Sequence, residues 1–173
     1  MNNIEDEWVS EFLENSIFRL DEGTRMIKIS LDSVSESNIW KKPNDSSNSI
    51  GNQILHICGN MTQYIIASLG EQDDYRKRDE EFSINGGLTK TQLIQKLENT
   101  VKKARLVLNG CNKRQLIKKR EVQGFTLSGI GIVIHAVEHY SYHTGQIAFW
   151  TKLMTNKDLG FYDGRDLNIK NEL

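Results

Sequence analysis

Proline and cysteine are scarce in this sequence of 173 residues, and each shortage excludes certain folds or kinds of site. Pro43 is the only proline, so long stretches lack the residue that most often interrupts a helix. This favours long helices over many strands and turns, and predicts an all-α fold. The two cysteines, Cys58 and Cys111, form no C-x-x-C pair, so neither a disulfide framework nor a cysteine zinc site is encoded.

An excess of either charge is also missing. Lysine plus arginine number 22 and aspartate plus glutamate 23, giving a formal net charge of −1. We therefore expect no nucleic-acid or membrane partner, but small molecules or proteins. The N-terminus is acidic and has no apolar run behind a basic start, so we expect no signal peptide and a cytoplasmic location. The length suits a single domain over residues 1–173.

Helical spacing of apolar residues predicts a bundle of four long helices, at about residues 5–31, 49–69, 90–108 and 126–154. The first has one apolar stripe that consists of Val9, Leu13, Ile17, Leu20, Ile27 and Leu31. The third opens on a capping box formed by Thr89 and Gln92. A tail over 156–173 follows, with Phe161 and Tyr162 as its expected packing residues.

Three polar segments connect the expected helices. Residues 33–49 contain Pro43 and the turn-forming run NDSSNS, with room for one helical turn near Trp40. The charged run after Gly70 is interpreted as solvated surface. Residues 110–124 include a short alternating piece near Val122, either a strand or an irregular crossover.

The second and fourth helices lack the charges that a surface helix normally carries. No charged residue occurs from Ser49 to Gly70, and Glu138 is the only one in the last helix before Lys152. A membrane span is excluded for the second helix by its polar residues, which are Asn52, Gln53, His56, Asn60 and Gln63. Both helices are therefore expected to be buried inside the protein.

All four histidines lie on these two uncharged helices. His135, His139 and His143 share one helix face, and an adjacent pair can reach one ion about 2.0–2.1 Å away. All three cannot, because His135 and His143 are roughly 12 Å apart along the axis. One pair therefore binds, and His56 supplies the third ligand.

Three imidazoles suit a divalent transition metal, namely zinc, nickel, iron or copper, better than magnesium or calcium. Three protein ligands also leave one coordination position open, as catalytic sites require. A lone buried histidine is usually only hydrogen-bonded, but the clustering here favours a metal site. Cys58 is interpreted as a core residue and Cys111 as an incidental loop cysteine, and no G-x-S-x-G elbow supports a serine hydrolase.

The segment HAVEHYSYHTGQI, residues 135–147, resembles the last long helix of DinB and YfiT-like proteins. IGNQILHICGNMTQYI, residues 50–65, resembles their second helix, and the pattern is most similar to an uncharacterised bacterial branch. The resemblance implies an antiparallel four-helix bundle with one long crossover. It also implies a metal bound by His56, His139 and His143, and it leaves the role of His135 open.

Members of that superfamily with a defined activity are thiol transferases or thiol-dependent isomerases. The resemblance therefore implies a metal-dependent enzyme, specifically a transferase that uses a low-molecular-weight thiol and a small-molecule substrate. Candidates to support the metal or relay a proton are His135, Gln146, Glu138 and Asn60. A metal-dependent hydrolase and a non-catalytic metal- or ligand-binding module are the alternatives. A homodimer is expected, with Gly145 as a position that permits close helix packing.

Overall fold

The computed structural model describes residues 4–171 and confirms the all-α class. Its long helices are α1 (Ile4–Ser33), α2 (Ile50–Met61), α4 (Lys90–Asn109) and α6 (Gly129–Thr155), and α2 continues as the π-helix η2 (Thr62–Leu69). The short elements are the 3-10 helix η1 (Glu36–Asn38), α3 (Arg78–Ser83), α5 (Lys113–Ile117), β1 (Lys119–Val122) and β2 (Phe125–Ser128).

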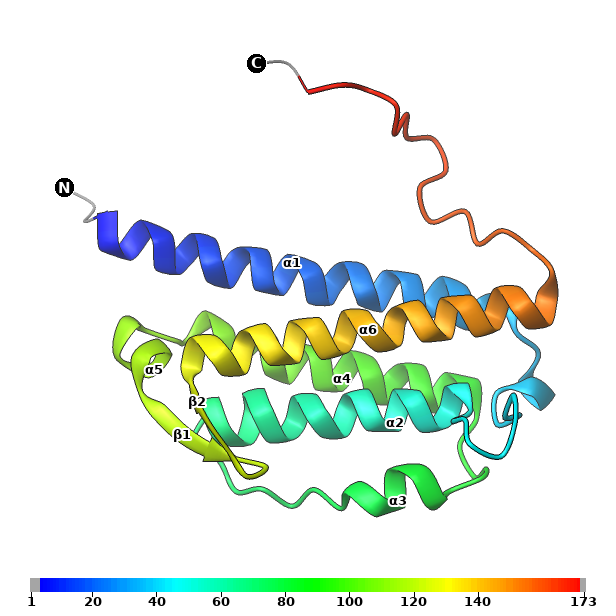
Figure 1. Ribbon diagram of the computed structural model, residues 1–173, viewed down its shortest axis with the longest axis horizontal. Coiled ribbons are helices and arrows are strands. Elements are labelled where there is room, and N and C mark those ends of the chain that lie inside the picture. The colour runs from blue at the N-terminus through cyan, green and yellow to red at the C-terminus, as the bar shows by residue number, and fades with distance from the viewer. Residues whose placement is uncertain (1–3, 172–173) are drawn as a thin grey trace.

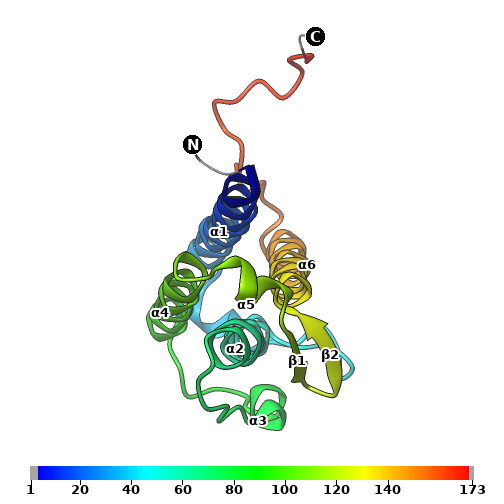
Figure 2. The ribbon, with the colours of Figure 1, turned by 90° about the vertical axis from the view of Figure 1, so that its left-hand side faces the viewer.

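The four long helices stand at the corners of a diamond, with α1 opposite α2 and α4 opposite α6 (Figure 2). α1 and α6 run in one direction, and α2 and α4 run in the other (Figure 1). Neighbours are therefore antiparallel in two pairs and parallel in two, whereas the resemblance implied an antiparallel bundle. Because α2 and α4 are parallel, residues 70–89 must return along the bundle, and this connection carries α3 past α2.

The predicted stripe of α1 faces the core, where Leu20, Ile27 and Leu31 are fully buried. Burying one such side chain stabilises the fold by roughly 1.5–3 kcal/mol. The capping box of Thr89 and Gln92 starts α4 as predicted. Apolar side chains of all four helices meet in one core, to which the other helices contribute Ile54, Ile57, Leu93, Leu97, Ile132 and Ile147.

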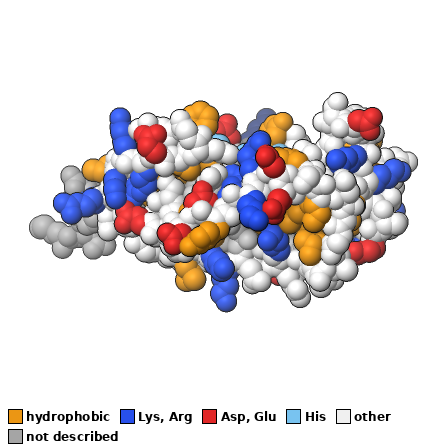
Figure 3. Space-filling model, turned by 90° about the horizontal axis from the view of Figure 1, so that it is seen from below, with side chains coloured by type: hydrophobic (Ala, Val, Ile, Leu, Met, Phe, Trp, Pro, Cys, Tyr) orange, Lys and Arg blue, Asp and Glu red, His pale blue; other side chains and the backbone are white. Residues whose placement is uncertain are grey.

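The uncharged helix α2 is buried along almost its whole length, as its composition predicted. For α6 the same prediction is wrong on one face, where Tyr142 and Phe149 are 62% and 68% exposed, because no described helix covers that side. Ser49 caps the first turn of α2 and is itself buried. Gly51 lets the ring of Trp40 lie directly on the helix, since a Cβ there would come within 2.7 Å of that ring. No described helix is long and apolar enough to cross a membrane. Acidic and basic side chains are intermixed on the face shown in Figure 3.

The start of the last helix and the packing of the tail differ from the sequence prediction. The last helix begins at Gly129 instead of about residue 126, because residues 125–128 pair with 119–122 as an antiparallel hairpin. Its turn, Gln123-Gly124, has φ of 52° and 82°, as in the tight turns that join hairpin strands. In the tail, Leu159 is buried and Tyr162 is 44% exposed, so the expected packing through Tyr162 is wrong.

Candidate metal centre

Three of the four histidines converge between α2 and α6. Potential ligand atoms of His56, His139 and His143 all lie within 4.8 Å of one another. His56 Nε2 and His139 Nε2 face each other at 3.0 Å. His56 and His143 are buried, and His139 is half-buried. The four-residue spacing on α6 and the antiparallel approach of α2 therefore bring these three rings to one point.

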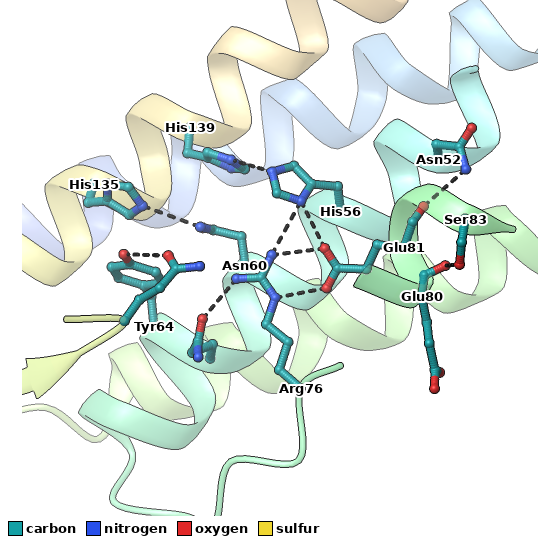
Figure 4. Close-up of polar contacts among 12 residues, drawn as sticks. Asn52, His56, Asn60, Tyr64, Arg76, Glu80, Glu81, Ser83, His135 and His139 are labelled. Atoms are coloured by element: carbon teal, nitrogen blue, oxygen red, sulfur yellow. Dashed lines mark hydrogen bonds and ion pairs between the residues drawn. The ribbon is translucent and has the colours of Figure 1, made fainter. Parts of the chain in front are cut away.

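Glu81 of α3 fixes the orientation of the His56 ring (Figure 4). His56 Nδ1–H donates to Glu81 Oε2 at 2.8 Å, and both side chains are buried. A proton on Nδ1 leaves the Nε2 lone pair of a neutral ring directed at the other histidines. Metal-ligating histidines typically make such a bond to a carboxylate with the nitrogen that does not bind the metal.

Arg76 holds Glu81 in turn, from the connection between η2 and α3. Its Nε donates to Glu81 Oε1 at 2.8 Å and its Nη2 to Glu81 Oε2 at 2.9 Å, a bidentate pair. Nη1 donates to Gln63 Oε1 at 2.8 Å, and the Arg76 side chain is only 3% exposed. Burial by itself would raise the pKa of Glu81, but hydrogen bonds from Arg76 and His56 hold it below its usual value. Glu81 is therefore a carboxylate at neutral pH.

Gly59 provides the space for this ion pair on the surface of α2. A Cβ at that position would lie 1.9 Å from Glu81 Oε1 and 3.0 Å from Arg76 Nε. Any side chain there would push the carboxylate off the helix. This glycine is thus required by a close approach, not by its backbone conformation.

Burial keeps the α6 histidines neutral. Desolvation, with smaller contributions from the neighbouring histidines and Arg76, lowers the pKa of His139 to about 3. Desolvation and His56 likewise lower the pKa of His143 to about 4. Neutral rings are what a metal needs, since a protonated imidazole nitrogen has no lone pair to offer.

His135 lies outside this cluster, as the family resemblance implied; the spacing alone left open which adjacent pair would bind. Its Nε2 accepts a hydrogen bond from the Asn60 amide at 3.3 Å, which leaves Nδ1 as the protonated nitrogen of the neutral ring. The ring stacks on Tyr64 with centroids 4.1 Å apart, and the Tyr64 hydroxyl donates to Gln123 at 2.9 Å. His135 is therefore held by Asn60 of α2 and Tyr64 of η2, and its ring also stacks on that of His139 with centroids 5.7 Å apart. Burial lowers its pKa.

The other two sequence candidates lie on different sides of α6. The Gln146 side chain is close enough to His143 to raise the pKa of that ring against the larger effect of burial. Glu138 is exposed and lines a shallow groove with Trp8 and Phe12 of α1. Its charge raises the pKa of His135 through space, against the larger effect of burial.

Sequence reasoning missed Arg76, Glu81 and Gly59. It assigned the charged run after Gly70 to solvated surface, and for Arg76 and Glu81 this is wrong. A buried histidine on an uncharged helix needs a hydrogen-bond partner from another segment of the chain. This need was the only signal in the sequence for a carboxylate beside His56. The run from 71 to 81 has nine charged residues, six of them carboxylates, and the sequence alone does not show which carboxylate the crossover brings to His56.

The residues present fit a divalent transition metal. In tetrahedral geometry, nitrogens bound to one ion at 2.0–2.1 Å lie about 3.4 Å apart, so the widest separation of 4.8 Å must close by about 1.4 Å, within the reach of side-chain rotation. His143 Nδ1 is buried without a hydrogen bond of good geometry among the described residues. An atom of this kind calls for a partner that is not a protein group.

Comparison with known protein families assigns the chain to a family. Residues 7–162 match the family described as "Protein of unknown function (DUF1572)". The chain belongs to this family. No curated protein matches this DUF1572 protein significantly.

Solved structures show that the DUF1572 protein has a DinB-like fold. A conserved protein from Enterococcus faecalis superposes with a TM-score of 0.72 at 16% identity, covering 83% of this chain and 97% of the other. A DinB-like protein from Bacillus subtilis gives 0.66 at 17% identity, covering 88% and 99%. A mycothiol-dependent maleylpyruvate isomerase gives 0.56 at 14% identity, covering 80% of this chain and 59% of that one. The resemblance stated from the sequence is confirmed for the fold.

Proposed function

We propose that this protein is a divalent-metal-dependent enzyme that transfers a low-molecular-weight thiol to a small electrophilic molecule. The observation that carries the proposal is the convergence of three imidazoles, without a carboxylate among them, between α2 and α6. His56, His139 and His143 would hold zinc, nickel, iron or copper. An ion with only neutral ligands keeps its full charge, and when bound it would lower the pKa of a neighbouring thiol towards neutrality.

The residues around the triad are suited to orienting a small ligand. His135 lies one turn from His139 on α6, with its Nδ1–H available as a donor because Asn60 occupies Nε2. Gln146 lies almost one turn beyond His143 on the other side. Donor and acceptor groups thus flank the metal ligands along the same face of α6, and they would position a bound molecule beside the ion.

Thiol transfer is favoured over hydrolysis because no carboxylate among the described residues is available as a base at the site. Glu81 is engaged by His56 and bidentately by Arg76, and Glu138 is exposed. A metal hydrolase commonly needs a carboxylate to take the proton of its water. A thiol, with a pKa of about 8.5, loses its proton far more readily than water and depends less on such a base. The structurally similar maleylpyruvate isomerase is mycothiol-dependent, which also supports a thiol reaction here.

A screen of metal-loaded protein tests this proposal. Low-molecular-weight thiols are offered together with electrophilic acceptors such as epoxides, maleyl compounds and aryl halides, and thioether or isomerised product is followed by mass spectrometry. The protein should turn over at least one pair, and His139→Ala should lose that activity. Equal turnover by His139→Ala, or cleavage of esters and amides without any thiol reaction, would refute thiol transfer.

The expected homodimer remains a prediction, which the outward face of α6 supports. Gly145 faces open space, since a Cβ added there would meet no atom of the described residues within 4 Å. Tyr142 and Phe149, on either side of it, are 62% and 68% exposed. A second α6 would cover these rings across the glycine. Light scattering should give twice the mass of one chain, and Gly145→Arg should give a monomer; a monomeric wild type contradicts the prediction.

A further inference from the structure

A groove between α1 and α6 exposes apolar side chains on the outward face of α6. Its volume is about 510 Å³, and Trp8 and Ile134 in its walls are 43% and 53% exposed. At about 100° per residue, Ile134, Glu138 and Gly145 lie within about 40° of one another, so the groove continues the face on which the homodimer is predicted. An exposed apolar groove with charged rims is typical of an interaction site. The lining residues are Trp8, Glu11, Phe12, Asn15, Ser16, Arg19, Ile134, Val137 and Glu138.

The C-terminal tail exposes apolar side chains that are not buried by their own chain. Leu159 is the last buried residue of the described chain, and every described residue after Phe161 is exposed. Leu167 and Ile169 are 67% and 75% exposed. The tail passes beyond α1 and extends away from the four helices (Figures 1 and 2). Residues two apart in an extended chain point to the same side, so Leu167 and Ile169 form one apolar edge.

The charges beside this apolar edge match those on the rim of the groove in sign and in spacing. Arg19 and Glu11 are eight residues apart on α1, which is about 12 Å. Asp166 and Lys170 are four residues apart in the tail, which is about 13 Å in an extended chain. A tail that runs antiparallel to α1 therefore places Asp166 beside Arg19, with the apolar edge over the groove. Lys170 then lies beside Glu11.

The position of the groove favours the tail of a second copy over the tail of the same chain. In its own chain, Ile134 lies 21 residues before Thr155, about 32 Å back along α6. In two α6 helices that cross antiparallel at Gly145, Thr155 of one copy lies level with His135 of the other, because each is ten residues from the glycine. Residues 156–167 span up to about 40 Å when extended. The tail of the second copy thus begins beside the groove and is long enough to lie in it.

We propose that the groove between α1 and α6 binds residues 166–170 of a second copy, so that two copies exchange their tails. The inference rests on the homodimer proposed with the function, and not on the metal or the thiol. The exchange is reciprocal, because a two-fold axis gives both copies the same groove and the same tail. The dimer therefore contains this contact twice.

Substitutions of exposed residues test the proposal in the full-length chain. Leu167→Asp removes the tail side of the contact and Ile134→Asp the groove side. Leu106→Asp on α4, opposite α6, is the matched control, since Leu106 is 66% exposed. Analytical ultracentrifugation measures the dimer dissociation constant, after circular dichroism has shown equal helix content. Loss of one aliphatic side chain should weaken each contact at least about tenfold, and therefore the dimer at least about 100-fold. Leu106→Asp should stay within about threefold of the wild type.

A mixture of the two variants distinguishes exchange between copies from docking within one chain. Leu167→Asp keeps an intact groove and Ile134→Asp keeps an intact tail, so a mixed dimer contains one complete contact. The mixture should associate at least about tenfold more tightly than either variant alone. A mixture that associates no more tightly than its components, or a monomeric wild type, would overturn the exchange. A wild-type dimer that neither substitution weakens more than Leu106→Asp does would keep the homodimer and refute the tail contact.

Discussion

Replacing Glu81 by glutamine should weaken metal binding without removing any ligand. The glutamine oxygen still accepts from His56 Nδ1–H, but the bond loses its charge assistance, which roughly halves its strength. Arg76, which is 3% exposed, is left without its counter-charge and will pull on the new amide. The His56 ring is then less firmly held with Nε2 towards His139.

Loss of a partner of this kind typically costs 10–100-fold in metal affinity. This corresponds to roughly 1.4–2.7 kcal/mol. Zinc affinity is measured by competition with a chromogenic chelator at pH 7.5, after circular dichroism has shown equal helix content in variant and wild type. We expect the dissociation constant of Glu81→Gln to rise by that factor.

Glu80→Gln is the matched control. Glu80 is the adjacent residue on α3, and it makes an exposed ion pair with Lys77 at 3.1 Å. Its replacement should leave zinc affinity within threefold of the wild type, because exposed pairs contribute little. Equal affinities for Glu81→Gln and Glu80→Gln, whether both normal or both weakened, would refute the role assigned to Glu81.

Two further predictions concern packing and pH. Gly59→Ala should lower both the melting temperature and the zinc affinity, because the alanine Cβ would displace Glu81. This loss should exceed the gain of about 1 kcal/mol that alanine brings to a helix. A variant more stable than the wild type would contradict this prediction. In metal-free protein the lowered pKa values of His139 and His143 mean that the unfolded chain binds more protons below pH 6.5. The contribution of these histidines to the free energy of unfolding is therefore fully present above pH 6.5. Measured by urea unfolding, the free energy of unfolding should fall by up to about 1.4 kcal/mol per histidine per pH unit down to pH 5. A profile that does not fall towards pH 5 would show that these rings are not buried and neutral. Replacing both by asparagine should remove most of the slope and leave the smaller part due to His135.

The sequence predicted the bundle well because its helices carry strong, regular signals. The apolar stripe of α1 and the Thr89 cap of α4 fix those helices locally, and the missing charges of α2 mark it as internal. The start of α6 was missed because Phe125 and Leu127 fit a helical pattern as well as a strand. Only the pairing of residues 125–128 with residues 119–122 decides between helix and strand, and this pairing is not a local property of the sequence.

The candidate site, too, could be predicted from the sequence only in part. His139 and His143 share a face by spacing alone, and the place of His56 followed from its polar stripe and the family resemblance. The positions of Glu81 and Arg76 depend on where the crossover passes. Residues on a connection have no periodicity that indicates what they face, so these contacts could be found only in the folded chain.

The metal content of purified variants tests the central claim most directly. Elemental mass spectrometry of protein loaded with zinc and then desalted should find about one ion per chain in the wild type and in His135→Ala. His56→Ala, His139→Ala and His143→Ala should each retain almost none, with helix content unchanged. Full retention of zinc by the double variant His139→Ala/His143→Ala, or its equal loss from His135→Ala, would show that the ion is not held where His56, His139 and His143 meet.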